Sequence, residues 1–270
     1  ATAVSADNEA KVNNLQVFIF RGDDLDAYAS VDNAQELTLS CTAGDRVVYA
    51  LVNAPDYSAV PGKAALLAKV SELSANSLTN FEMVGSKSVT LPQSEKVSID
   101  VNRIASRVVL KKITRSFTSE ALQALNFKVD AIYLINVTGN TSYDLSAAPA
   151  KWYNVAENKN ELASLLYDAP ASLITHGQSY STAHTFYAYP NDLATNTTRL
   201  VIETTLGETK YYYPINLPQM DSNKSYEIEE VKITRPGSDD PDEPVSFADA
   251  TFSVNVIDWT VVPITEGTTI

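Results

Sequence analysis

The sequence predicts a mainly β protein with a few short helices. Short segments in which apolar and polar residues alternate recur along the chain, and turn-forming residues separate them. Tyrosine outnumbers phenylalanine by 14 to 8, and Ser and Thr are frequent, as is typical of exposed strands. With 270 residues and 44% hydrophobic content, the chain can form a sizeable core in one large or two ordinary domains.

The N-terminal half begins with a strong strand signal. Residues 15–20 read Leu-Gln-Val-Phe-Ile-Phe, and the Arg-Gly-Asp-Asp that follows ends the strand. Residues 36–41 and 46–53 have strand patterns on either side of the Thr-Ala-Gly-Asp turn at 42–45. We therefore expect these two segments to form a hairpin.

Residues 62–74 break this β pattern. Their leucines and Val70 fall at helical spacing with alanines between them, which predicts one amphipathic helix packed on a sheet. Strand patterns resume at residues 88–91 and 97–101. We place a domain boundary after them, which gives an N-terminal domain of residues 1–104 and a C-terminal domain of residues 105–270.

The second half repeats this organisation. Residues 127–137 alternate apolar and polar side chains and predict a long half-buried strand, while residues 158–167 are a short helix candidate. The turn Gly207-Glu208 joins two strand patterns into a predicted hairpin. The remaining strand segments are residues 185–190, 199–206, 209–215 and 225–234.

A proline-rich acidic linker, residues 235–244, separates these strands from the C-terminal segment. We expect this linker not to fold on its own. The strand pattern then returns with two apolar sets of opposite parity, and a bulge or bend near Val256 and Ile257 would let both sets be buried. The candidate polymerisation residues of this strand are Phe252, Val254, Val256, Ile257, Trp259 and Val261.

The charge balance excludes several classes of partner. Lys and Arg total 20 against 33 Asp and Glu, so the net charge of −13 disfavours nucleic acid and anionic membrane surfaces. No apolar stretch approaches the roughly 20 residues of a membrane span, so we expect no transmembrane segment. The single cysteine, Cys41, cannot form an internal disulfide.

We expect no catalytic residues, no cofactor and no metal site, and the chain is not predicted to be an enzyme. It has two histidines and lacks the HExxH, CxxC, phosphate-loop and GxSxG motifs. Ser179 lies between His176 and His184 in the sequence, so a hydrolase is an alternative interpretation, but no residue pattern indicates an orienting acid or an oxyanion hole. Polar loop residues are the favoured interpretation.

Two short motifs have simple structural interpretations. The acidic run 238–243 lacks the glycine turn and the distal glutamate of a calcium loop, so a solvated linker is favoured. Residues 21–23 spell Arg-Gly-Asp, the integrin-binding tripeptide, but a match this short is common by chance. We interpret it as a strand-ending turn.

Several stretches, taken together and in order, carry a family resemblance. They are residues 11–20, 41–46, 107–113, 186–192, 211–214, 223–237 and 254–259. Through them the chain resembles the fimbrillins of Bacteroidia, the type V pilus subunits, and especially the major fimbrial subunit of the Porphyromonas type. The similarity is patchy but collinear over nearly the whole chain, and the order and spacing of the stretches carry it.

The resemblance implies two tandem β-sandwich domains of transthyretin-like topology. It also implies export as a lipoprotein precursor, proteolytic removal of an N-terminal strand near Ala1, and a place in a fimbria on the bacterial outer membrane. The groove opened by that removal would accept the C-terminal segment of a neighbouring subunit, about residues 245–270. The implied partners are other copies of the chain, accessory tip and anchor subunits, and host or bacterial surface ligands.

The leading hypothesis is a structural shaft subunit that polymerises by strand exchange and supports adhesion and biofilm formation. From the residues alone, a C-terminal strand that completes its own second domain is favoured, because most terminal strands pair within their own chain. A fimbrial tip adhesin or a surface glycan-binding lipoprotein is the alternative function.

Overall fold

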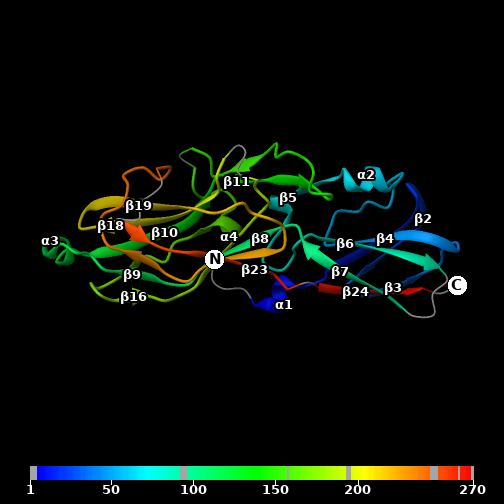
Figure 1. Cartoon of the computed structure of the whole chain (residues 1–270), viewed down its shortest axis with the longest axis horizontal. Coiled ribbons are helices and arrows are strands. Elements are labelled where there is room, and N and C mark those ends of the chain that lie inside the picture. The colour runs from blue at the N-terminus through cyan, green and yellow to red at the C-terminus, as the bar shows by residue number, and fades with distance from the viewer. Residues whose placement is uncertain are drawn as a thin grey trace. The chain divides into compact units, whose positions relative to one another are not determined.

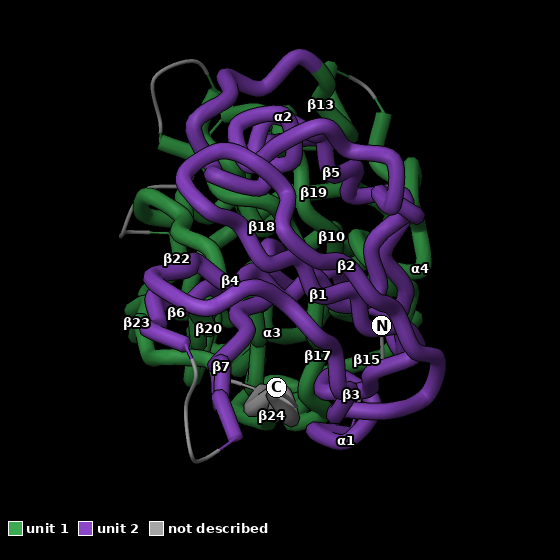
Figure 2. Tube along the Cα trace, turned by 90° about the vertical axis from the view of Figure 1, so that its right-hand side faces the viewer, with its two compact units in different colours: residues 1–4, 106–139, 151–259 green, residues 5–105, 140–150, 260–270 purple. Residues whose placement is uncertain are grey.

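The computed structural model describes residues 5–91, 96–156, 158–192, 196–243 and 249–260, and the backbone of 262–268. The chain forms two compact units (Figure 2). Unit 1 contains residues Ser106–Gly139 and Lys151–Trp259. Unit 2 contains Ser5–Ala105, Asn140–Ala150 and Thr260–Ile270. The C-terminal end of the chain therefore groups with the N-terminal residues.

Unit 2 is built on a seven-stranded sheet in the order β2-β1-β4-β6-β7-β24-β3 (Figure 1). All pairings are antiparallel except that of β24 with β3, which is parallel. Buried aromatic side chains such as Phe18 and Phe20 of β1 form its core. The strands are β1 (Asn14–Arg21), β2 (Asp24–Asp32), β3 (Glu36–Leu39), β4 (Gly44–Val52), β6 (Met83–Leu91), β7 (Val97–Arg103) and β24 (Val262–Thr268).

Two expectations for unit 2 were wrong. The hairpin predicted across residues 36–53 does not form, because β3 pairs with β24 while β4 pairs with β1 and β6. The single helix predicted over 62–74 is three elements, because the chain leaves the helix at Ala68 to pair with a distant strand. The smaller elements are α1 (Ala6–Glu9), α2 (Lys63–Leu67), β5 (Val70–Glu72), η1 (Leu73–Ala75) and β12 (Asn140–Ser142), with β12 paired to β5.

Unit 1 contains a five-stranded sheet and two four-stranded sheets. The five-stranded sheet comprises β10 (Phe127–Ile135), β14 (Tyr167–Asp168), β15 (Ser172–Leu173), β18 (Arg199–Leu206) and β19 (Thr209–Asn216). One four-stranded sheet comprises β9 (Ile113–Arg115), β16 (Ser179–Tyr180), β21 (Val231–Ile233) and β22 (Ala250–Thr251). The other comprises β8 (Ser106–Leu110), β17 (His184–Ala188), β20 (Lys224–Ile228) and β23 (Val254–Asp258).

Small elements complete unit 1. They are α3 (Glu120–Gln123), α4 (Ala163–Leu166) and the paired β11 (Val137–Thr138) and β13 (Trp152–Tyr153). The predicted hairpin is confirmed as β18 and β19, which meet at Gly207 with φ of 63°. The predicted mainly β architecture with a few short helices is thus confirmed.

The acidic linker is more ordered than expected. Ser238 and Tyr212 exchange backbone hydrogen bonds of 2.8 and 2.9 Å, so residues 235–243 lie along β19. The Tyr213 hydroxyl donates to the Arg235 carbonyl at 2.8 Å. A Cβ at Gly237 would lie 2.2 Å from the Tyr212 carbonyl oxygen, so only glycine permits this close approach.

Candidate functional site

The predicted polymerisation residues lie in and beside β23 of unit 1. This strand pairs with β20 from Lys224↔Asp258 to Ile228↔Val254 and forms an edge of its sheet. Val256 and Ile257 are 51% and 47% exposed, whereas Phe252 and Val254 are half-buried.

Trp259 ends this segment as a core residue of unit 1. Its side chain is buried and stacks on Tyr187 with ring centres 5.8 Å apart, and the Arg107 guanidinium lies 5.2 Å from its ring centre. Val261 lies outside the described residues. The segment up to Trp259 is thus placed within its own unit, which is the interpretation that the residues alone favoured.

The chain then supplies a further strand to unit 2. Strand β24 lies between β7 and β3 (Figure 1). It is antiparallel to β7 from Val262↔Val101 to Glu266↔Val97 and parallel to β3 from Thr265↔Glu36 to Thr268↔Leu39. We call the space between β7 and β3 the strand slot.

The walls of the strand slot have the alternation of a half-buried sheet. Along β7, buried residues alternate strictly with exposed ones, and β3 follows the same pattern. The buried wall residues are Leu37, Leu39, Val97, Ile99 and Val101. A strand entering the slot therefore meets a continuous apolar floor as well as unpaired backbone groups on two sides.

Strand β24 connects two parts of the sheet. Strand β6 pairs with β7 only through Met83↔Arg103 and Val84↔Asn102, at one end of β7. The remaining residues of β7 and all of β3 pair with β24. Removing β24 would leave two strand edges open in unit 2, and open edges are sites at which another chain can pair.

A buried arginine marks the entrance to the strand slot. Arg103 is 2% exposed and lies at the end of β7. Its Nε donates to the Glu9 carbonyl at 2.9 Å, and its Nη1 donates to the Thr260 carbonyl at 2.6 Å. The guanidinium thereby holds both the last residue of α1 and Thr260, the residue that precedes the C-terminal strand of unit 2.

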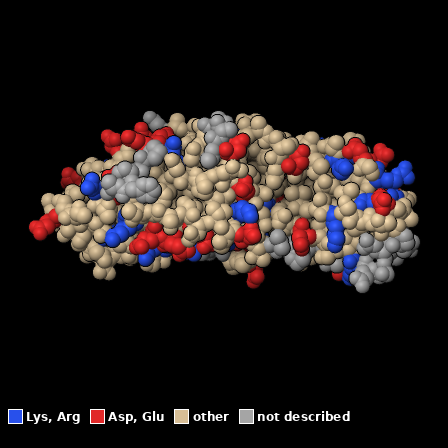
Figure 3. Space-filling model, viewed as in Figure 1, with Lys and Arg blue, Asp and Glu red and all other residues tan. Residues whose placement is uncertain are grey.

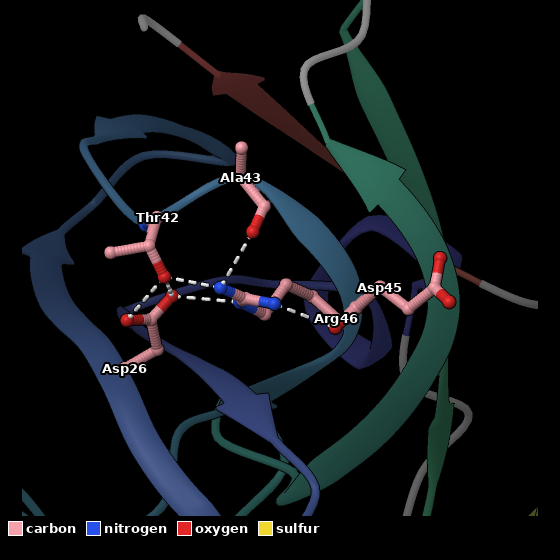
Figure 4. A network of polar contacts seen from close by, with 5 residues as sticks. All are labelled: Asp26, Thr42, Ala43, Asp45 and Arg46. Carbon is pink, nitrogen blue, oxygen red and sulfur yellow. Dashed lines mark hydrogen bonds and ion pairs between the residues drawn. The ribbon is translucent and has the colours of Figure 1, made fainter.

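A second arginine fixes the turn that connects β3 to β4 (Figure 4). The buried Arg46 donates through Nε to Asp26 Oδ2 at 2.8 Å and through Nη1 and Nη2 to the Asp45 and Ala43 carbonyls at 2.8 and 3.0 Å. Thr42 donates to both Asp26 carboxylate oxygens and accepts from Arg46 Nη2. The network ties the chain that follows β3 to β2, so one wall of the strand slot is held in place.

The electrostatics of this network agree with its geometry. Burial alone would raise the pKa of the Asp26 carboxyl, but hydrogen bonds from Arg46 and Thr42 outweigh it and lower that pKa. The carboxylate therefore stays charged and keeps both partners across the neutral range.

His184 and Ser179, two of the residues behind the hydrolase alternative, do not form a catalytic pair with each other. His184 is buried, its Nδ1 lies 2.7 Å from Asp168 Oδ2, and its Nε2 lies 3.0 Å from the Tyr180 hydroxyl. Ser179 instead bonds the Thr114 hydroxyl at 2.6 Å. Both imidazole nitrogens thus have structural partners, and Ser179 is not among them.

Two further classes of site, metal centres and membrane spans, were assessed over the described residues. Within the described ranges, no group of three or more His, Cys, Asp or Glu side chains is placed to hold a metal ion. No helix among the described residues is long and apolar enough to cross a membrane.

The Arg-Gly-Asp tripeptide is the turn between β1 and β2, and Asp23 accepts from the Ala64 amide at 2.7 Å. On the face shown in Figure 3, basic side chains are scattered rather than gathered in one patch.

Comparisons with known proteins agree with the sequence resemblance. Residues 1–110 match the family model of the major fimbrial subunit protein, FimA. The resemblance to the fimbrillins is thereby confirmed. The fimbrillin match covers the β1–β7 part of unit 2, which includes both walls of the strand slot. It is a match to a structural subunit of fimbriae, consistent with a chain predicted not to be an enzyme.

Solved structures extend the similarity of fold to nearly the whole chain. A candidate cell adhesion protein from Bacteroides eggerthii is 22% identical with a TM-score of 0.72, over 97% of this chain and 92% of that one. The fimbrilin from Porphyromonas gingivalis is 17% identical with a TM-score of 0.67, over 94% and 92%. A fimbrial assembly protein from Parabacteroides distasonis is 10% identical with a TM-score of 0.56, over 93% and 92%. No curated protein matches the chain in sequence.

The candidate polymerisation residues named from the sequence end at Val261, within a predicted donor segment of about residues 245–270. The strand that pairs with both walls of the strand slot begins at Val262, one residue later. The size of Trp259 could have indicated that the segment of unit 1 ends there, because so large a side chain is well suited to anchor a strand in the core of its unit. Neither Arg103 nor Asp26 stands out in the sequence, since their partners are 157 and 20 residues away.

Proposed function

We propose that this protein is a shaft subunit of a bacterial surface fimbria and that it assembles by strand exchange. The observation that carries the proposal is the pairing of β24, from the C-terminal end of the chain, with both walls of a slot in unit 2. The same slot in a neighbouring copy offers the same partners. A strand given to a neighbour would therefore keep every contact that it makes within its own chain.

Such an exchange produces a filament rather than a closed dimer. The donated strand and the accepting slot are different surfaces of the subunit, so the contact is heterologous and each new copy again presents a free slot or a free strand. The buried floor residues Val97, Ile99 and Val101 supply the apolar part of the joint. The backbone pairs with β7 and β3 supply the polar part.

The resemblance to the fimbrillins supports finer proposals. We propose two tandem domains, residues 1–104 and 105–270, of transthyretin-like topology, with a donor segment inside about residues 245–270. Within that segment we propose β24 as the inserting strand and the stretch from Phe252 to Trp259 as its anchor. The precursor would be a lipoprotein that loses an N-terminal strand by proteolysis. The mature fimbria would stand on the outer membrane with accessory tip and anchor subunits and support adhesion and biofilm formation.

Disulfide trapping tests the exchange directly. Ser98 of β7 is exposed and lies opposite Thr265 of β24, and facing residues of antiparallel strands have Cβ atoms about 4.5–5.5 Å apart. We expect Ser98→Cys with Thr265→Cys, in a Cys41→Ser background, to give a ladder of covalent oligomers on a non-reducing gel after assembly and oxidation.

The control for this experiment is the variant that carries Ser98→Cys alone, which should give no ladder. If the double variant forms the bond only within single chains, under conditions where filaments are seen by negative-stain microscopy, strand exchange is not the joint of the filament. If no filaments form under any condition, the shaft role itself is contradicted.

A further inference from the structure

Strand β23 of unit 1 ends the sheet β17-β8-β20-β23, and within the described residues its partner strand is β20. The Trp259 amide donates to the Asn223 carbonyl at 3.0 Å, one residue past the last pair of β20 with β23. Hydrogen-bonded and non-hydrogen-bonded pairs alternate along antiparallel strands. The backbone amides and carbonyls of Val254, Val256 and Asp258 therefore point away from β20, toward the open side of the sheet.

The side chains along this open edge are mostly apolar and carry no net charge. Val256 and Ile257 are 51% and 47% exposed. The charged residue of the strand, Asp258, is paired with Lys224 of β20. Edge strands of soluble proteins usually carry an unpaired charge, a proline or a bulge, which stops another chain from pairing with them. Strand β23 has none of these devices, since its register with β20 is regular and residues 254–257 read Val-Asn-Val-Ile.

The other long edges of the described sheets are covered or charged. The strands of five or more residues that end a sheet are β2, β17, β19 and β23. Every residue of β17 is buried, and the linker pairs with β19 at Tyr212. Strand β2 carries the exposed Asp24 and Asp32, which would repel a second chain of the same net charge. Of these four edges, β23 is the one that offers both backbone groups and an uncharged surface.

We propose that β23 pairs antiparallel with β23 of a second copy of this chain, about a two-fold axis at Val256. In this register Val256 lies opposite its counterpart in the second copy, and each Val254 lies opposite an Asp258. The outward backbone groups of one strand then meet those of the other, so all of them are paired. Both copies use the same surface, which makes the contact isologous and closed.

The charge of the chain favours a copy of itself at this particular edge. A net charge of −13 makes two copies repel each other over most of their surface, so a contact between copies needs a locally neutral patch. In the two-fold register the two Asp258 carboxylates lie at opposite ends of the contact, roughly 13 Å apart along the strands, and each keeps its own Lys224. The centre of the contact joins two half-exposed Val256 side chains.

The proposed contact is small, and its surface is distinct from the strand slot. A pair of five-residue edges buries less than the roughly 1,200 Å² of a stable interface, so we expect a dimer with a Kd on the order of 0.1 mM. The contact does not require β24 to be exchanged. In a fimbria of the kind proposed above, the same weak contact repeated along two fibres would hold them side by side.

Sedimentation velocity on a chain that cannot exchange strands isolates this contact. The closed chain carries Ser98→Cys with Thr265→Cys in the Cys41→Ser background and is oxidised within single chains. We expect it to dimerise as its concentration rises from about 10 to 500 μM. Val256→Lys in the closed chain should weaken the dimer at least about 10-fold, because two like charges then meet on the axis.

The matched control is Ser88→Lys in the closed chain. It makes the same change of charge at an exposed residue of β6 in unit 2, so it should leave the Kd of the dimer unchanged. Val256 is half exposed, so both lysine variants should keep the thermal midpoint of the closed chain.

Cysteine cross-linking tests the register. In the Cys41→Ser background alone, Val256→Cys places two thiols on the axis with Cα atoms about 5.5 Å apart, within the range of a disulfide. The matched control is Asn255→Cys, an exposed neighbour that lies opposite Ile257 in this register. Its two copies are diagonal, roughly 7–8 Å apart, so Val256→Cys should form a disulfide dimer at least about 10-fold faster.

Three outcomes would overturn the proposal. One is a closed chain that stays monomeric at about 500 μM, which would leave this edge to a different partner. Another is an equal Kd for Val256→Lys and Ser88→Lys. The third is cross-linking of Asn255→Cys as fast as that of Val256→Cys. These outcomes leave strand exchange untouched, because the first two use a closed chain and the third does not involve β24.

Discussion

Replacing Arg46 by Met should destabilise unit 2 and leave unit 1 unchanged. The Arg46 side chain is 2% exposed and donates four hydrogen bonds, to Asp26, Thr42, Ala43 and Asp45. Methionine fills much of the same volume but leaves the partly buried Asp26 carboxylate without its cation. Removing one member of such a pair typically costs about 3–5 kcal/mol, and we expect a loss in this range.

Native-state hydrogen exchange followed by mass spectrometry can assign that loss. Amides of β1 and β4 should exchange at a free energy of opening lowered by the amount above, whereas amides of β10 in unit 1 should not change. Both tryptophans, Trp152 and Trp259, belong to unit 1, so tryptophan fluorescence serves as the internal control. Combining Arg46→Met with Asp26→Asn should show a coupling of at least about 1.5 kcal/mol.

The destabilisation caused by Arg46→Met should depend on pH, and the direction of this dependence can be predicted. The folded pKa of Asp26 is lowered, so its contribution to stability is present above the ordinary carboxyl pKa of about 4 and is lost as the pH falls through the folded value. The penalty of Arg46→Met should therefore shrink in acid. A loss below about 1 kcal/mol at neutral pH, or one that grows in acid, would refute the reasoning.

Two further changes test other parts of unit 2. Burial raises the pKa of Glu82, which accepts from Ser71 and Tyr143 at 2.5 and 2.7 Å. The stabilising effect of the Glu82 carboxyl is complete below its ordinary pKa and is lost as the pH rises through its pKa in the folded protein. Glu82→Gln should therefore flatten the dependence of the thermal midpoint on pH between about 4 and 8. An unchanged slope would contradict this prediction. Arg103→Met should lower the free energy of unfolding by about 3 kcal/mol, because two charge-assisted hydrogen bonds are lost, and it should speed amide exchange at residues 262–268. Equal exchange in the parent and the variant would contradict the role of Arg103 at the slot entrance.

Local patterns were sufficient where local pairing decides the structure. The strand at residues 15–20 and the β18–β19 hairpin follow from alternation and turn chemistry, and both are present. The hairpin across residues 36–53 failed because β3 takes its partner from the other end of the chain. A sequence window that contains β3 and β4 carries no information about a competing strand that is distant in the sequence.

The burial of β10 on both faces could not be predicted from the sequence for a related cause. Residues 127–137 alternate well enough to predict a strand with one wet face. A bulge between Val129 and Ala131 shifts the register of β10 against β18, and residues 131–135 are buried on both faces. Composition predicted that residues 235–244 do not fold on their own, but it could not indicate that Gly237 lets this segment lie against the backbone of Tyr212.

A strand slot filled by the protein's own C-terminus is compatible with a filament, because closure and exchange use the same contacts. The balance between them is set by the connection and by concentration rather than by the joint itself. Only residues 259–261 separate β23 from β24, and Trp259 is buried in unit 1. The length of this connection affects the balance, since a short connection restricts the directions in which the strand can leave its anchor. In the strand exchange proposed above, Trp259 would fix the start of the connection, because its side chain belongs to the core of unit 1.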